Sequence, residues 1–223
     1  SPETPLYIKS KSLYNLNLAQ SSIQKEGYAI LTEGYMDVIS CFQAGIHNII
    51  ASLGTSLSDG HVKLLKRYTN EVVIAYDADK AGTEATSRGL DLLVKGDIRV
   101  RVLTIPSGKD PDDFVRSYGA EQLRKLIKDA VDLIDYKLYR VNEYESIKNI
   151  EGKKKAVSEL IATLANMNNE IERSEYVKKC AERLDIEEEY IWRELRKFGI
   201  DKRIQRSTIP KIEAKPKRSA KEN

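Results

Sequence analysis

Cysteine and histidine are almost absent from this chain. Its 223 residues include two cysteines, Cys41 and Cys180, and two histidines, His47 and His61. So few sulfur and imidazole groups exclude a cysteine-rich zinc site and provide no disulfide framework. The sequence therefore predicts a protein of a reducing compartment, the cytoplasm, with no zinc bound by these residues.

Long apolar runs are also missing. No stretch approaches the ~20 consecutive apolar residues of a membrane-spanning helix, and the opening SPETPLYIKS has no signal-peptide pattern. Hydrophobic residues nevertheless make up 41% of the chain, enough at this length for a substantial core. We expect a globular protein with no membrane partner. Because no initiator methionine is present, we also expect a piece of a longer protein.

Charge is divided unevenly along the chain. Residues 202–223 contain eight Lys or Arg against two Glu, so this tail carries +6, whereas the whole chain carries +3. Removing the tail leaves −3 for residues 1–201. A basic tail can attract nucleic acid through its phosphates, but Pro210 and Pro216 also suit a solvated linker. We interpret residues 201–223 as a basic flexible linker.

Strand-like and helix-like segments alternate from residue 29 to residue 119. Short apolar runs predict strands in YAILTEG, NIIASLG, EVVIAYDAD and RVRVLTIP. Between them, MDVISCFQAG, LSDGHVKLLKRY and AGTEATSRGLDLLVKG have helical patterns, with Ser58 as the candidate cap of the second. Strands separated by helices of about 10–15 residues indicate an α/β fold, a mostly parallel sheet with helices on both faces.

Residues 120–200 carry helical patterns and no strand signal. Val157, Leu160, Ile161 and Leu164, for example, follow the spacing of an amphipathic helix. We expect an all-α helical bundle after the α/β domain. Residues 176–198 also fit a helix–turn–helix, but the second helix would begin with three glutamates, which is unfavourable in a DNA groove.

Acidic pairs follow three of the predicted strands. They are Glu33 and Asp37, Asp77 and Asp79, and Asp110 and Asp112. Because parallel strands end at the same edge of a sheet, these carboxylates would lie together and repel one another unless a cation joined them. Mg²⁺ prefers such oxygen ligands, and an acidic site that holds it suits phosphoryl chemistry. For Asp37 or Asp112 alone, a role at a helix start is the alternative.

Three motifs closely resemble those of the Toprim domain, the metal-binding α/β module of primases, topoisomerases and some nucleases. They are EGYMDVI, YDADKAG and GKDPDDF. Together with ASLGTSLSDGHVKLLKR, they are similar to the bacterial replicative primases, whereas topoisomerases usually show a DxDxD run. The resemblance implies a basic leading segment over residues 1–28, a Toprim domain over 29–119 and, over 120–200, the bundle of the RNA-polymerase domain.

The resemblance also implies roles for the acidic residues. Glu33, Asp77 and Asp79 match the catalytic residues: the glutamate helps to bind metal and serves as general base, and the two aspartates form the metal-binding DxD pair. Mg²⁺ is the implied ion, with Mn²⁺ as a substitute. The full metal-binding set comprises Glu33, Asp37, Asp77, Asp79, Asp110 and Asp112.

The partners implied by the resemblance are nucleic acid, nucleotides and a helicase. Lys9 and Lys80 match positions that contact nucleotide or template, although IKS and LYNL stand where the family has HKG and LYGL. Such primases condense ribonucleoside triphosphates into RNA primers on single-stranded DNA and release pyrophosphate. They meet the replicative helicase through a C-terminal domain, which we expect to lie outside this sequence. The rival is a Toprim nuclease, which would cleave DNA with similar carboxylates.

Overall fold

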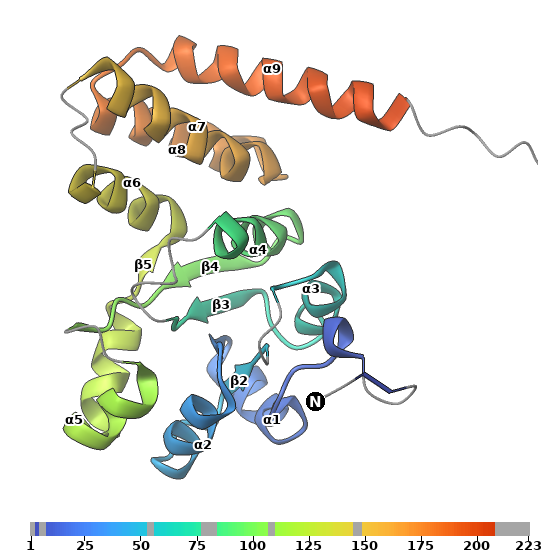
Figure 1. The fold of residues 1–223 in the computed structure, drawn as a ribbon, viewed down its shortest axis with the longest axis vertical. Helices are drawn as coiled ribbons and strands as arrows, with labels where there is room; N and C mark the ends of the chain where they lie inside the picture. Colours follow the sequence, from blue (N-terminus) through green and yellow to red (C-terminus); the bar gives the residue numbers. More distant parts are fainter. Residues whose placement is uncertain are drawn as a thin grey trace, which may run out of the picture.

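The computed structural model describes residues 3–4, 8–52, 56–76, 84–106, 110–144 and 149–207 (Figure 1). Its centre is a five-stranded sheet with the strand order β2-β1-β3-β4-β5. The first four strands are parallel, as predicted, and β5 pairs antiparallel with β4. The strands are β1 (Ala29–Thr32), β2 (Ile49–Ala51), β3 (Glu71–Ile74), β4 (Arg99–Val102) and β5 (Val131–Asp132).

Helices cover both faces of the sheet, because successive strand residues point to opposite sides. Leu31 and Ile74 belong to one hydrophobic cluster, whereas their neighbours Ile30 and Val73 belong to another. Helices α1 (Leu16–Glu26), α3 (Asp59–Leu65), α4 (Glu84–Lys95) and α6 (Leu133–Tyr144) contribute to the first cluster. Helices α2 (Tyr35–Gln43) and α5 (Pro111–Lys128) contribute to the second.

Helix α5 crosses residues 119 and 120, where the sequence suggests the change from α/β to helical structure. Gly119 interrupts its helical geometry with a φ of 80°. Leu123 and Ile127, beyond this kink, are buried in the second cluster of the sheet. The short strand β5 follows at Val131, although the sequence shows no strand signal there. Two residues are too few to show a period, so only pairing with β4 reveals this strand.

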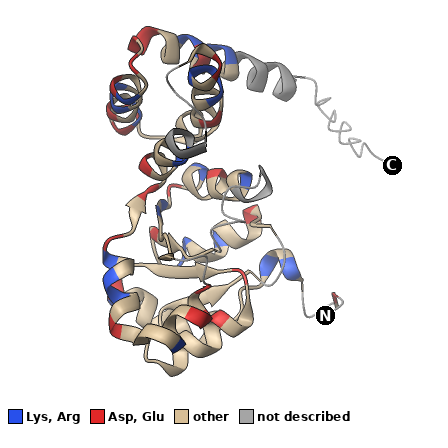
Figure 2. Cartoon of the chain, turned by 60° about the vertical axis from the view of Figure 1, so that its left-hand side comes forward, with Lys and Arg blue, Asp and Glu red and all other residues tan. Residues whose placement is uncertain are grey.

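The remaining helices form the expected bundle at one end of the molecule (Figure 1). A third hydrophobic cluster joins α6 to α7 (Ile150–Asn166), α8 (Glu170–Leu184) and α9 (Glu188–Ser207). Helix α9 continues into the segment predicted as a linker. Figure 2 shows both signs of charge on these helices. None of the helices within the described ranges is long and apolar enough to cross a membrane.

A buried polar network joins the bundle to the sheet. Nζ of Lys137 on α6 lies 3.2 Å from Oδ1 of Asp91 on α4 and donates to Oγ1 of Thr163 on α7 at 2.6 Å. The Thr163 hydroxyl in turn donates to Asp91 Oδ1 at 2.6 Å. Both charged side chains are almost fully buried, so each depends on the other for compensation.

We expect Asp91→Ala to destabilise the fold by about 3–5 kcal/mol, because it leaves the Lys137 ammonium buried without its counter-charge. Urea unfolding followed by circular dichroism measures this loss. Glu194→Ala is the matched control, since it removes an exposed ion pair with Lys197 and should cost no more than about 1 kcal/mol. Equal losses in the two variants would contradict the importance of the buried network.

Candidate active site

Glu33 lies at the carboxyl end of β1, between the ends of two neighbouring strands. It directly follows β1, which pairs with β2 on one side and with β3 on the other. Its Oε1 atom is buried. Burial raises the pKa of the Tyr76 hydroxyl, and the negative charge of Glu33 raises it further, whereas a hydrogen bond with Ser52 lowers it. Since Tyr76 immediately precedes Asp77, the Glu33 carboxylate lies beside the point where the β3 segment leaves the sheet.

Asp77, Asp79 and Lys80 lie outside the described residues. The catalytic and metal-binding roles predicted for the two aspartates, and the nucleotide contact predicted for Lys80, therefore stay predictions.

Asp37 connects the starts of α2 and α5. Its Oδ2 accepts a hydrogen bond from the backbone of Gly34, and its Oδ1 accepts one from the backbone of Asp112, both at 3.3 Å. Asp110 is the N-cap of α5 and accepts a hydrogen bond from the backbone of Asp113 at 2.7 Å. Carboxylates are stabilised at helix N-termini by the exposed N–H groups. These contacts correspond to the helix-start alternative that the sequence left open for Asp37.

The same carboxylates surround Cys41 on α2. The pKa of this thiol is raised to about 12, first by burial and then by the negative charges of Asp37, Asp112 and Asp110. Cys41 therefore stays protonated at neutral pH and is no nucleophile. Asp112 also pairs with Arg116, whose Nε lies 2.5 Å from its Oδ1. The three aspartates thus gather on one face of the sheet, at the junction of α2 and α5.

The donor atoms at this edge suit a divalent cation, since carboxylate oxygens are the ligands that Mg²⁺ takes in proteins. Among the described residues, however, no three His, Cys, Asp or Glu side chains are grouped closely enough to hold a metal ion. Glu33 is the described member of the central set, and Asp77 and Asp79 follow Tyr76 in the chain. The predicted metal-binding set stays a prediction.

The segment that carries Lys9 is docked on the start of α3. It forms the short 3-10 helix η1 (Lys9–Lys11), which lies near the N-terminus in Figure 2. Nε2 of the buried His61 lies 2.7 Å from the Lys9 carbonyl oxygen, and the Ser58 hydroxyl donates to the Ser10 carbonyl oxygen at 2.6 Å. A Cβ atom on Gly60 would lie 2.3 Å from that same Ser10 oxygen. The position of Lys9 thus depends on a close backbone contact with α3.

Sequence reasoning missed His61 and Gly60 as supports of this segment. The predicted cap at Ser58 is confirmed, because its side chain accepts a hydrogen bond from the His61 backbone at 3.3 Å. A glycine within the first turn of a short helix was the available signal, because glycine is unfavourable there unless another backbone approaches closely.

Two family descriptions match the chain. A Toprim-like family matches residues 30–115, which contain β1 to β4 and the start of α5. The DnaB-helicase binding domain of primase matches residues 146–189, which contain α7 and α8. The second match differs from the sequence analysis, which places the helicase-binding domain outside this chain.

The most similar relatives that we compared are primases. The chain is 42% identical over 192 residues to a DNA primase of Clostridium acetobutylicum, covering 86% of this chain and 32% of that protein. It thus spans about a third of the length of this curated relative.

Solved primase structures share the fold. A DNA primase domain from Pseudomonas aeruginosa is similar with a TM-score of 0.75 and 31% identity, covering 88% of this chain and 62% of that chain. A DnaG primase catalytic domain bound to single-stranded DNA is similar with a TM-score of 0.73 and 30% identity, covering 85% of this chain and 61% of that chain. Such coverage extends well past residue 119, so the similarity includes helices of the bundle. Since sequence, sheet topology and bundle all agree with these proteins, the chain belongs to the bacterial DNA primase family.

Proposed function

We propose that this chain is part of the catalytic core of a DNA primase. The core synthesises short RNA primers on a single-stranded DNA template by condensing ribonucleoside triphosphates. In each step, a 3′-hydroxyl attacks the α-phosphate of a triphosphate, a new phosphodiester bond forms, the bond between the α- and β-phosphates breaks, and pyrophosphate leaves.

The observation that carries this proposal is the place of Glu33. Its carboxylate follows the strand between β2 and β3, beside the segment that leads to Asp77 and Asp79. In open parallel sheets, ligands bind outside the carboxyl ends of the strands. The relatives support a primase rather than a nuclease, because they are named DNA primases.

In this proposal, Glu33, Asp77 and Asp79 hold Mg²⁺, for which Mn²⁺ substitutes. A bound divalent cation stabilises the negative charge that develops on the phosphates during displacement. Glu33 also accepts the proton of the attacking hydroxyl. Asp37, Asp110 and Asp112 add negative potential from the α2–α5 junction, where they already have structural contacts.

Lys9 contacts the phosphates of nucleotide or template in this proposal, with Lys80 as a second cation. Support comes from the docking of η1 on α3, which holds the Lys9 backbone in one position. The single-stranded DNA named for one structural relative is consistent with such a template.

We further propose that residues 146–189 contribute to contact with the replicative helicase, because a helicase-binding family description matches them. Ile150 on α7 and Ile171 on α8 are 74% and 78% exposed, so these helices offer apolar surface to a partner. Such a partner places the protein in the cytoplasm.

We expect Glu33→Gln to weaken Mn²⁺ binding by more than about tenfold, because it removes one anionic ligand of a small set. Asp77→Asn combined with Asp79→Asn should do the same, while Glu194→Gln on α9 should bind like the wild type. Mn²⁺ titration followed by electron paramagnetic resonance measures each affinity.

The same Glu33→Gln change, placed in the whole primase, should lower the kcat of primer synthesis by about 10²–10⁴-fold, because the general base is lost. Separation of radiolabelled products on a gel measures this. Strand cleavage by the wild type without nucleotide condensation would favour the nuclease rival and overturn the proposal.

Gly60→Ala should raise the KM for nucleoside triphosphate about tenfold and leave kcat nearly unchanged, because the new Cβ displaces η1 and weakens a contact to a charged phosphate. Steady-state primer synthesis by the whole primase provides both constants. Gly199→Ala is the matched control, since a Cβ there meets open space. An unchanged KM in Gly60→Ala would show that η1 does not position a nucleotide-binding residue.

A further inference from the structure

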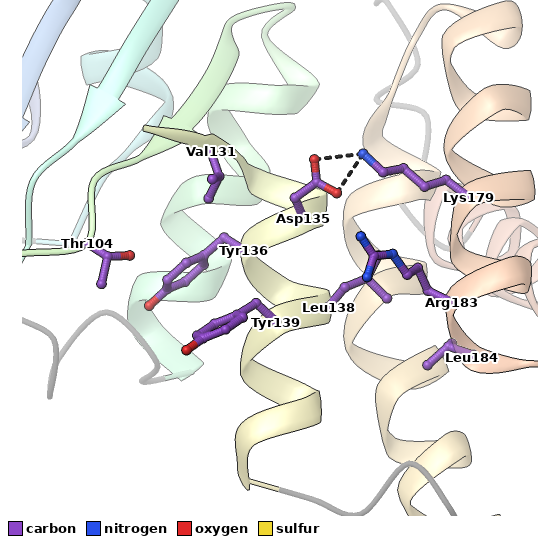
Figure 3. Close-up of a pocket in the computed structure, with 9 residues that line it drawn as sticks. All are labelled: Thr104, Val131, Asp135, Tyr136, Leu138, Tyr139, Lys179, Arg183 and Leu184. Carbon is purple, nitrogen blue, oxygen red and sulfur yellow. Dashed lines mark hydrogen bonds and ion pairs between the residues drawn. The ribbon is translucent and has the colours of Figure 1, made fainter. Parts of the chain in front are cut away.

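A pocket of about 590 Å³ lies between the sheet and the helical bundle (Figure 3). Tyr136 and Tyr139 of α6 line one side, and Lys179 and Arg183 of α8 line the other. The pocket also includes Thr104, which lies two residues beyond the end of β4. Because β4 is parallel to β3 and β1, this pocket begins at the same sheet edge as the candidate active site.

The aromatic side of the pocket has one covered and one accessible ring. Tyr136 and Tyr139 lie one helical turn apart and point in the same direction, toward Thr104 (Figure 3). Tyr136 is buried, and its hydroxyl accepts a hydrogen bond from Arg140 at 3.3 Å. Tyr139 is 60% exposed, which is unusual for so large an apolar ring beside a pocket. Its ring is therefore available for stacking.

The α8 side of the pocket carries an excess of positive charge. Among the residues that line the pocket, Asp135 alone is acidic, and its Oδ1 lies 2.6 Å from Lys179 Nζ. Arg183 is exposed and forms no ion pair with any described residue. Leu138 and Leu184, which also line the pocket, are buried. One uncompensated guanidinium thus stands over apolar surface, opposite an accessible tyrosine.

We propose that this pocket binds one nucleotide of a single-stranded nucleic acid, with its base on Tyr139 and its phosphate at Arg183. An aromatic ring for the base and a cation for the backbone are the usual elements of single-strand binding. The volume is that of a small-molecule site. The inference rests on the proposed function for the identity of the strand, which passes from the sheet edge along Thr104 toward the bundle. An acidic peptide is the other occupant that this chemistry allows.

The test compares two eight-residue DNA oligomers, one of thymidines and one with abasic residues at the centre, by fluorescence anisotropy with the 223-residue chain. The basic segment 202–223 binds both oligomers through their phosphates, so the difference in affinity reports on base stacking. We expect the wild type to prefer the thymidine oligomer by about 5- to 150-fold, the range for one stacked base. Tyr139→Ala should abolish this preference, and Tyr139→Trp should retain it.

Arg183→Gln tests the phosphate contact. Loss of one contact to a single strand should reduce the slope of log affinity against log salt concentration by about 0.7. The matched controls are Tyr190→Ala and Arg196→Gln on α9, an exposed tyrosine and an exposed arginine outside the pocket, and they should behave like the wild type. Circular dichroism confirms that each variant is folded.

Unchanged preference in Tyr139→Ala together with an unchanged salt slope in Arg183→Gln would overturn the proposal. If the same variants instead lost binding of an acidic peptide, the pocket would be a protein-binding site, and the proposal would be equally overturned. Glu33→Gln separates this inference from the proposed function. It should stop primer synthesis and keep the Tyr139-dependent preference, so each conclusion can fail without the other.

Discussion

The parallel pairing of β1 with β2 and β3 is the constraint on which the rest of the structure depends. Ile30 lies opposite Ile49 on one side and Val73 on the other. Parallel strands all end at the same edge, so Glu33 after β1, Tyr76 after β3 and Thr104 after β4 meet there. Antiparallel pairing would have sent the acidic motifs to opposite edges. The alternating burial of these strands maintains the arrangement, because a one-residue slip would exchange the two buried faces.

Helix α4 carries this arrangement from the sheet edge to the bundle. It begins directly after the segment that contains Asp77 and Asp79, and its Asp91 accepts hydrogen bonds from Lys137 of α6 and Thr163 of α7. A buried charge keeps its compensation in few orientations, so the network restricts how α6 and α7 sit against α4. The pocket between α6 and α8 is thereby held beside the sheet edge.

The strands and the two-faced sheet could be predicted because their signals are local. Apolar runs such as VVI in β3 are continuous when both faces are buried, and the helices between them have their own period. The convergence of the acidic motifs followed from the parallel order alone. The dual use of Asp37 could not be read in this way, since its contact with the Asp112 backbone joins helices that are 75 residues apart. Strand β5 and the continuation of α5 past Gly119 were hidden for the same reason.

The sequence by itself determined the α/β order, the helical bundle, the resemblance to primases and the acidic residues at the strand ends. These properties depend on residue type and on spacings within one or two elements. Only the tertiary structure decided that His61 and Gly60 support Lys9, that Lys137 is neutralised by Asp91, and that Tyr139 and Arg183 line one pocket. Each of these depends on contact between elements far apart in the chain, and no local periodicity encodes which side chains will meet.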